Sequence, residues 1–313
     1  MTERSAAARH GNTPVRPILK WAGGKRQLLP ALRRYYPRGF NRYVEPFLGS
    51  GAVFLDCHNC GLLERRDARL SDVNGDVIGC YRMVRDAVDE VIEDLRELEA
   101  GRRQSGVDHF YEVRDERFNP LRKQHPSESS LSAAYTPALA AMLIYLNRTG
   151  FNGLFRVNSR GDFNVPAGRY GHLRICDSDN LRQLSRALRR PGLTLDVAMF
   201  EESLAVCGSG DFVYLDPPYA PLSRTSRFTA YTAGGFGVEE QARLQQLVIQ
   251  LAARGANVLL SNSVAPEIRK LYKENDDARR AGLKARTVSA RRAINSRASA
   301  RGAIREYLIT NVR

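Results

Sequence analysis

The short apolar run Phe212–Leu215 ends in the sequence Asp216-Pro217-Pro218-Tyr219. An apolar run that stops at a polar residue and two prolines is typical of a buried strand in an open α/β sheet, whose ligands bind at the carboxyl ends of the strands. The prolines restrict the backbone, so we expect the Asp216 carboxylate, the Pro217 carbonyl and the Tyr219 ring to keep one arrangement. The pattern therefore predicts an α/β fold with a rigid loop at its binding site.

The groups in this loop suit an exocyclic amine. Such an amine can lie against the Tyr219 ring while it donates one hydrogen to Asp216 and the other to the Pro217 carbonyl, which turns its lone pair toward an electrophile. N-methylation is a reaction of this kind. Since no cysteine accompanies the loop, we expect direct in-line attack without a covalent enzyme intermediate. The alternative is an ordinary turn after a strand, because Asp and Pro are common turn residues.

Two further segments have the composition of ligand-binding loops, residues 20–25 (KWAGGK) and 44–51 (VEPFLGSG). The second is a Gly-rich turn after a predicted strand, where the backbone can approach a cofactor closely. Glu45 in this turn would repel a pyrophosphate but favours a cationic group such as an ammonium or a sulfonium. Asp72 ends the next apolar segment, where the hydroxyls of an adenosine ribose are commonly bound. Together these residues predict S-adenosylmethionine as the cofactor.

With these motifs the chain resembles the DNA adenine N6-methyltransferases of the Dam type, the D12 class with a DPPY motif. The resemblance spans most of residues 17–265 and weakens between about 102 and 133 and after about 267. It depends on five blocks in order: KWAGGK, EPFLGSGAVF, SDVNGDVI, LNRTGFNGLFRVNSRGDFNVPAGRY and YLDPPYAPLSRTSRFTAY. It implies the α/β fold of S-adenosylmethionine-dependent methyltransferases, a mixed, mostly parallel sheet flanked by helices, with a helical DNA-recognition insertion.

The resemblance also implies roles for individual residues. The DPPY loop would hold a flipped adenine, and its catalytic residues would be Asp216, Pro217 and Tyr219. The cofactor pocket would be formed by the first two loops, the acidic strand end and the DPPY loop. Its predicted residues are Trp21, Ala22, Gly23, Lys25, Glu45, Phe47, Gly49, Asp72 and Asp216.

Residues 147–170 combine glycines, arginines and phenylalanines, a composition that favours a hairpin-like loop in contact with DNA. Arginine can bind guanine or phosphate, and an exposed aromatic ring can insert into a base step that flipping leaves open. The alternative is a Gly-rich hairpin whose phenylalanines belong to the core. For Phe155 and Phe163 we favour this alternative.

The resemblance assigns the remaining residues of this block to the DNA. It implies the sequence GATC, with Phe151 inserted beside the flipped base in place of the tyrosine that we would expect. The second half of GATC would be contacted by Leu154 and Arg156, and the first half by Lys20, Arg169 and Tyr170. The complete set of predicted DNA-binding residues is Lys20, Arg148, Phe151, Asn152, Leu154, Arg156, Asn158, Arg169 and Tyr170.

The charge of the chain agrees with double-stranded DNA as the partner. It has 48 Lys and Arg against 34 Asp and Glu, a net charge of +14, which attracts a polyanion and predicts salt-dependent binding. Arginines crowd the C-terminal stretch, where we favour a surface that faces phosphates. A solvated face is the alternative for any one of them. The residues concerned are Arg279, Arg280, Lys284, Arg286, Arg291, Arg292, Arg297, Arg301 and Arg305.

The sequence does not indicate a membrane, a metal ion or an obligate protein as a further partner. No segment reaches the roughly 18 consecutive apolar residues of a membrane span, and residues 1–15 have no apolar signal core. The five cysteines are scattered along the sequence, and their odd number does not suggest a disulfide framework, so we expect reduced thiols in the cytoplasm. Cys57 and Cys60 form a lone C-x-x-C, in which at least one thiol should face the core. We expect neither a metal nor an obligate protein partner.

The order of the segments predicts three parts. Residues 1–15 would be a disordered leader, 16–85 and 176–313 the catalytic domain, and 86–175 a helical target-recognition domain with a hairpin at 147–170. Within these parts we expect one helix over 84–99, a surface loop over 124–132 and a final edge strand over 305–312.

Three functions compete at this stage. The favoured one is a DNA adenine methyltransferase that flips the base. The second is an amine or glutamine N-methyltransferase, although such enzymes usually have Asn at the position of Asp216. The third is a catalytically inactive DNA-binding protein on the same fold, which the intact Lys25, Asp72, Asp216 and Tyr219 disfavour.

Overall fold

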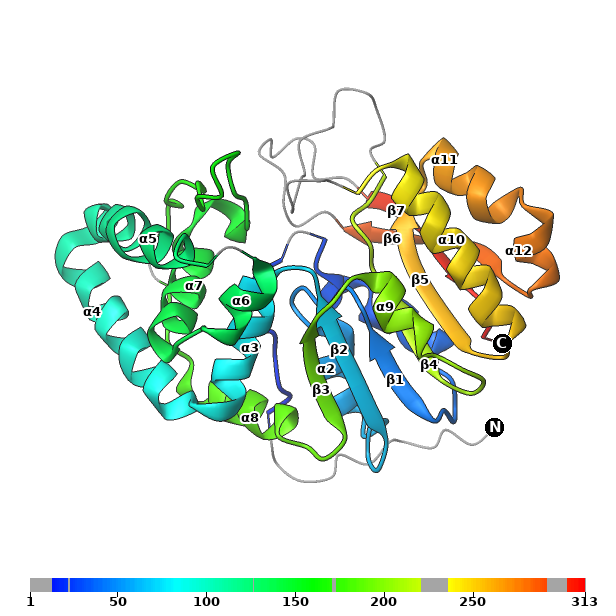
Figure 1. The fold of residues 1–313 in the computed structure, drawn as a ribbon, viewed down its shortest axis with the longest axis horizontal. Helices are drawn as coiled ribbons and strands as arrows, with labels where there is room; N and C mark the ends of the chain where they lie inside the picture. Colours follow the sequence, from blue (N-terminus) through cyan, green and yellow to red (C-terminus); the bar gives the residue numbers. More distant parts are fainter. Residues whose placement is uncertain are drawn as a thin grey trace.

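The computed structural model describes residues 13–21, 23–125, 127–170, 173–220, 236–291 and 303–312. In this part of the chain a seven-stranded sheet has the order β3-β2-β1-β4-β5-β7-β6 (Figure 1). The first five strands are parallel, whereas β7 is antiparallel to both β5 and β6. The strands are β1 Arg42–Glu45, β2 Asp67–Asp72, β3 Leu193–Val197, β4 Phe212–Leu215, β5 Asn257–Ser263, β6 Lys284–Arg291 and β7 Ala303–Thr310. The predicted mixed, mostly parallel sheet is confirmed.

Strand order reverses between β1 and β4. From β1 the chain proceeds through β2 to β3 on one side of the sheet, whereas β4 pairs with the opposite side of β1 and leads to β5. The connections leave the carboxyl ends of β1 and β4 in opposite directions, which opens a crevice between them. The Gly-rich turn and the DPPY loop follow these two strands directly, so the fold brings both motifs to this crevice.

Helices cover both faces of the sheet because successive strand residues point to opposite sides. On one face, Tyr43 and Tyr214 pack in a hydrophobic cluster with α2, α3 and α8. On the other, Val44 and Leu215 pack with α9 and α10 (Figure 1). The helices are α1 Leu29–Leu32, α2 Ala52–Asn59, α3 Gly75–Asp86, α4 Val88–Glu112, α5 Asn119–Arg122, α6 Glu128–Ala133, α7 Pro137–Thr149, α8 Ser178–Leu188, α9 Phe200–Ala205, α10 Val238–Ala253, α11 Pro266–Ile268 and α12 Asp276–Arg280.

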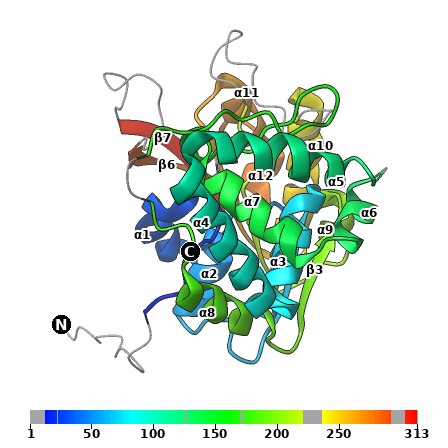
Figure 2. The ribbon, with the colours of Figure 1, turned by 90° about the vertical axis from the view of Figure 1, so that its left-hand side faces the viewer.

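The predicted helical insertion forms one end of the molecule. Helices α4 and α7 pack against each other and against α3, and a π-helical segment, Val113–Phe118, joins α4 to α5 (Figures 1 and 2). One continuous hydrophobic cluster includes Leu95 and Phe110 of the insertion together with Leu70 and Phe54 beside the sheet. The insertion is therefore packed onto the same core as the catalytic strands.

Three of the predicted elements are wrong. Ala87, with φ −135° and ψ 46°, separates α3 from α4, so there is no single helix over 84–99. The predicted loop over 124–132 contains the start of α6, because the Ser127 hydroxyl caps this helix by accepting from the N–H of Ser130 at 3.1 Å. The final strand β7 is not at an edge, since it lies between β5 and β6.

Only the end of the predicted leader falls within the described residues. Val15 is buried, and its N–H donates to the side-chain oxygen of Asn59 at 3.0 Å. The predicted disorder of residues 1–12 lies outside the described part of the chain, as do the predictions for Ala22, Arg292, Arg297 and Arg301.

Candidate active site

Lys25 and Asp216 form an ion pair at the carboxyl end of β4. Lys25 Nζ lies 2.8 Å from Asp216 Oδ1 and also donates to the Gly23 carbonyl at 2.6 Å. Only 3% of the Lys25 side chain is exposed. Burial raises the pKa of Asp216 to about 6, and the Lys25 ammonium opposes this rise. The carboxyl group is therefore mostly ionised at neutral pH and can accept hydrogen bonds from a bound amine.

The ring of Tyr219 lies between Lys25 and Glu306. Lys25 Nζ is 4.6 Å from the ring centroid, and the Tyr219 hydroxyl donates to Glu306 Oε2 at 2.5 Å. The ammonium lies over one face of the ring, so a planar base that stacks on Tyr219 would take the opposite face.

Polar side chains from α10 and β5 hold the DPPY loop. Gln241 Nε2 donates to the Pro218 carbonyl at 2.9 Å, and Asn262 Nδ2 donates to Gln241 Oε1 at 3.0 Å. Ser263 Oγ donates to the Ala220 carbonyl at 3.0 Å. Sequence reasoning missed these residues, although the run Ser261-Asn262-Ser263 at the end of an apolar strand was a usable signal.

The Gly-rich turn lies directly against Trp21. Gly49 has a φ of +45°, and a Cβ at this position would lie 2.7 Å from Trp21 Cδ1, so only glycine fits. The Trp21 ring stacks on Phe155 with 5.6 Å between centroids and 26° between planes. Trp21 therefore connects the predicted cofactor turn with the predicted recognition hairpin.

The buried Glu45 and the half-buried Asp72 place two carboxyl groups beside this turn. Asp72 accepts from the N–H groups of Gly49 at 2.9 Å and Asn74 at 3.0 Å, and burial raises its pKa to about 6. Glu45 accepts from the Tyr43 hydroxyl at 2.7 Å and from the Phe54 N–H at 3.1 Å. Burial, together with the nearby charges of Asp216 and Asp72, raises the pKa of Glu45 to about 8.

These carboxyl groups fit a cationic cofactor. Burial opposes the ionisation of Glu45, Asp72 and Asp216, and at each of them neighbouring acidic groups add repulsion. A positively charged ligand beside them would relieve both effects. S-adenosylmethionine contains a sulfonium and an α-ammonium group. Of the other predicted cofactor residues, Gly23 is exposed beside Lys25, and the half-buried Phe47 ring stacks on Phe200 at 5.7 Å.

The predicted recognition hairpin is joined to the first loop. Asn147 at the end of α7 accepts from the Lys20 N–H at 2.7 Å and donates to the carbonyls of Lys20 at 2.8 Å and Gly153 at 3.1 Å. Lys20 Nζ lies 4.5 Å from the centroid of the Tyr170 ring, whose hydroxyl donates to the Gly150 carbonyl at 3.3 Å. Residues that are distant in the sequence are thus brought to one surface.

The hairpin separates its aromatic residues into two groups. Phe155 and Phe163 are buried, which confirms their predicted place in the core, whereas Phe151 is 41% exposed. Arg156 and Arg169 are exposed, and Leu154 and Asn152 are half-buried. Arg156 Nε donates to Asn164 Oδ1 at 2.8 Å, which holds its guanidinium along the hairpin.

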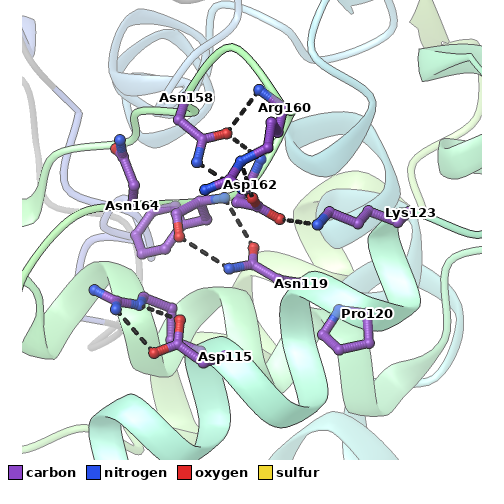
Figure 3. A pocket seen from close by; sticks show the side chains of 10 residues that line it. Asp115, Asn119, Pro120, Lys123, Asn158, Arg160, Asp162 and Asn164 are labelled. Atoms are coloured by element: carbon purple, nitrogen blue, oxygen red, sulfur yellow. Dashed lines mark hydrogen bonds and ion pairs between the residues drawn. The ribbon is translucent and has the colours of Figure 1, made fainter.

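Two of the predicted DNA-binding residues support the protein backbone. Arg148 donates to the carbonyls of Ile18 at 3.2 Å and Arg174 at 3.0 Å. Asn158 Oδ1 accepts from the N–H groups of Arg160 and Asp162, each at 2.9 Å. Asn158 lines a pocket of about 540 Å³ between the hairpin and α5 (Figure 3), and Asp216 is not among the residues that line it.

A buried ion pair anchors the hairpin to the catalytic core. Arg122 Nη2 lies 2.7 Å from Asp76 Oδ2, and the Tyr135 hydroxyl donates to Asp76 Oδ1 at 3.1 Å. Arg122 Nη1 donates to the Gly161 carbonyl in the hairpin at 2.5 Å. Asp76 follows Asp72 at the start of α3, so this pair connects the start of α3 with the hairpin. Sequence reasoning missed it.

Other features of the described residues limit the chemistry. Arg279 and Arg280 in α12 form ion pairs with Asp276 and Asp277 of the same helix, which weakens their attraction for phosphate. Cys57 is buried, as predicted for one thiol of the C-x-x-C. Within the described part of the chain, no cluster of three His, Cys, Asp or Glu residues could hold a metal ion, and no helix is both long and apolar enough for a membrane span.

The chain is similar to known proteins over nearly its whole length. The family described as D12 class N6 adenine-specific DNA methyltransferase matches residues 21–293. The type II methyltransferase M1.LlaDCHI of Lactococcus lactis subsp. cremoris is 36% identical over 298 residues, which cover 95% of both chains. The type II methyltransferase M.MjaIII of Methanocaldococcus jannaschii is 35% identical over 95% of this chain and 99% of its own. The DNA adenine methylase of Escherichia coli K12 is 34% identical over 94% of both chains.

Proposed function

Because the chain belongs to the D12 class N6 adenine-specific DNA methyltransferases, we propose that it methylates adenine within GATC in double-stranded DNA, after flipping the base out of the helix. Family membership makes it an enzyme that methylates N6 of adenine in DNA, and implies S-adenosylmethionine as the methyl donor. The recognition sequence, the flipping of the base and the roles of individual residues are our proposal.

The observation that carries this proposal is the cluster of Lys25, Asp216 and Tyr219 at the carboxyl end of β4. The flipped adenine stacks on the face of the Tyr219 ring opposite Lys25, with its N6 amine beside the Asp216 carboxylate and the Pro217 carbonyl. Lys25, 2.8 Å from Asp216 Oδ1, keeps this carboxylate ionised. A carboxylate and a carbonyl accept both amine hydrogens, which leaves the nitrogen lone pair free to react.

The amine receives the methyl group directly. S-adenosylmethionine would supply an electrophilic methyl group, whose bond to sulfur breaks as the bond to N6 forms, so that S-adenosylhomocysteine leaves and N6 loses one proton. Asp216, with a pKa of about 6, can accept this proton and pass it to solvent. Covalent catalysis by cysteine is disfavoured, because burial raises the thiol pKa of Cys207 to about 11 and that of Cys57 well above its usual range.

The residues that bind the cofactor in this proposal lie at the same crevice between β1 and β4. Asp72 accepts hydrogen bonds from the ribose, and Glu45 provides negative charge for the cationic end of the cofactor. Trp21 and Gly49 form the wall of the pocket, since the indole ring lies in contact with the glycine. Of the remaining predicted residues of the pocket, Gly23 and Phe47 lie in the same two loops, and Ala22 falls outside the described residues.

The hairpin and Lys20 read the DNA in this proposal. Phe151 projects from the hairpin and fills the space that the flipped base leaves in the helix. Arg156 and Leu154 contact one half of GATC, and Lys20, Arg169 and Tyr170 contact the other. The contact of Lys20 with Tyr170 supports the assignment of these two residues to the same half-site.

The family match disfavours the two alternatives. Amine and glutamine N-methyltransferases act on other substrates, and the intact Lys25–Asp216 pair supports an active enzyme over an inactive DNA-binding protein. We place the enzyme in the cytoplasm, where all five cysteines would stay reduced, in agreement with their free thiols.

Methylation mapping on unmethylated DNA of random sequence tests this proposal. We expect N6-methyladenine in GATC, and methylation concentrated at another sequence would overturn the recognition site. Arg156→Ala should reduce discrimination at one base pair by about 1–3 kcal/mol. The matched control is Arg160→Ala at the exposed tip of the same hairpin, which should leave sequence preference unchanged. Equal, uniform weakening by both variants would assign Arg156 to the DNA backbone.

A further inference from the structure

We propose that Glu306 is a positioning residue for methyl transfer, which holds the ring of Tyr219 in the orientation that receives the adenine. This role depends on the proposed function, in which Tyr219 stacks on the flipped base. Glu306 does not contact the reacting atoms in this proposal, because it acts through the hydroxyl group of Tyr219.

The contact between the two side chains is short and direct. The Tyr219 hydroxyl donates to Glu306 Oε2 at 2.5 Å, across 87 positions of sequence. This length is typical of a hydroxyl donating to an ionised carboxylate, a stronger bond than one between neutral groups. The prolines fix the backbone of Tyr219 at one end of the side chain, and Glu306 holds the hydroxyl at the other.

Strand β7 gives Glu306 a rigid position. Glu306 lies opposite Ser263 of β5 and Val288 of β6, so its backbone is paired on both sides. Alternation along the strand places Glu306 on the same face as the buried Leu308, which belongs to the hydrophobic cluster beside α2. Tyr219 is therefore held by an interior strand of the sheet and not by a side chain from a loop.

A carboxylate at this position has an electrostatic cost. The negative charge of Glu306 raises the pKa of Asp216, and the Lys25 ammonium opposes this effect. A neutral acceptor would hold the hydroxyl without that cost, but through a weaker bond. A glutamate near Asp216 is explained if the strength of its bond to Tyr219 matters for the reaction.

Positioning of the base affects the chemical step more than the binding of cofactor. When Glu306 cannot accept the hydrogen bond, the Tyr219 ring is free to rotate about its Cα–Cβ bond, and the stacked adenine can shift relative to Asp216. Small displacements of reacting groups reduce rates strongly, by about 100-fold for 1 Å. We therefore expect the methyl-transfer rate to fall while the affinity for S-adenosylmethionine is unchanged.

A double-mutant cycle between Glu306 and Tyr219 tests this role. The single-turnover rate of N6-methyladenine formation is measured with saturating GATC duplex and S-adenosylmethionine. Glu306→Ala should slow the reaction by roughly 10- to 100-fold, and Glu306→Gln should slow it less, since its amide oxygen still accepts. In a Tyr219→Phe background neither change should have a further effect at a pH well above the Asp216 pKa of about 6, where Asp216 is ionised with or without the charge of Glu306. Glu267→Gln on the exposed surface of α11 is the matched control and should keep the wild-type rate.

Several outcomes would overturn the role of Glu306. The first is a wild-type rate for both Glu306 variants. The second is an equal loss of rate with and without the Tyr219→Phe substitution, and this result would mean that Glu306 only stabilises β7. Melting temperatures of the unliganded variants identify such destabilisation, and Glu306→Gln completes the cycle if Glu306→Ala does not fold. Failure of the wild-type enzyme to form any N6-methyladenine would instead overturn the proposed function.

Discussion

Asp216 is shielded from solvent and is nevertheless negatively charged, although burial normally disfavours the charged form of a carboxyl group. Burial raises its pKa to about 6, and the nearly inaccessible Lys25 ammonium keeps it from rising further. Below that pH the carboxyl group is protonated and accepts hydrogen bonds poorly. The rate should therefore fall as the pH decreases through about 6.

Lys25→Met should move this acidic limb to higher pH. Removing the ammonium removes the interaction that lowers the pKa of Asp216, so a larger fraction of the carboxyl groups is protonated at any given pH. The measurement is the pH dependence of kcat/KM, which reports groups of the free enzyme. Lys270→Met, on the exposed segment after α11, is the control. Identical acidic limbs in wild type and Lys25→Met would show that the ion pair does not set the ionisation of Asp216.

Asp72→Ala should weaken the binding of S-adenosylmethionine by about 1.5–3 kcal/mol, the range for a hydrogen bond to a charged group. Part of this loss would arise because the Gly49 N–H also loses its acceptor. Calorimetric titration measures the affinity, and Asp86→Ala at the exposed end of α3 serves as the control. Unchanged affinity would restrict Asp72 to ordering the two loops.

At the scale of elements, the order of motifs along the chain predicted the parts of the site that depend on local sequence. Strand ends followed by glycine or proline predicted the turn at Gly49 and the loop at Asp216 from the sequence alone. Glu306 and Gln241 were not predicted, because a glutamate on a strand or a glutamine on a helix has no distinctive local pattern. Their roles depend on contacts with residues 87 and 23 positions away.

The incorrect elements have similar physical causes. Ala87 ends α3 without the glycine or proline that usually marks a break, so hydrophobic spacing alone continued the helix across it. Ser127 begins α6 within a polar stretch that resembles a loop in composition. The place of β7 between two other strands follows from tertiary pairing, which periodicity does not encode.

The anchoring of the hairpin by α5 gives a prediction about stability. Arg122→Met leaves Asp76 buried without its cation, and loss of one partner from a buried pair costs about 3–5 kcal/mol. The free energy of unfolding should fall by that amount in urea titration. Adding Asp76→Asn should recover part of it, because the buried charge is then absent.

The matched control for the hairpin anchor is an exposed ion pair. Arg103 pairs with Glu99, and 76% of the Arg103 side chain is exposed. Arg103→Met should therefore lower the free energy of unfolding by less than about 1 kcal/mol. DNA affinity should fall only for Arg122→Met, since that change also releases the Gly161 carbonyl in the hairpin. A loss below about 1 kcal/mol for Arg122→Met would mean that the buried pair does not anchor the insertion.

At the scale of the whole molecule, charge and fold have separate roles. The net charge of +14 draws the protein to DNA, but several arginines are paired with acids, as Arg279 and Arg280 are in α12. In the proposed function, selectivity instead depends on the proposed cofactor and DNA sites lying close together on one core. Trp21 contacts both the glycine turn and Phe155 of the hairpin, so the proposed cofactor and DNA sites would be separated by a single side chain.

The central claim is that Asp216 directs the methyl group to N6 of adenine. Mass spectrometry of nucleosides, after incubation of a GATC duplex with S-adenosylmethionine, measures the product directly. The wild-type enzyme should form N6-methyladenine, whereas Asp216→Ala should form almost none while it still binds the duplex. A normal yield from Asp216→Ala, or N4-methylcytosine from the wild-type enzyme, would contradict the claim.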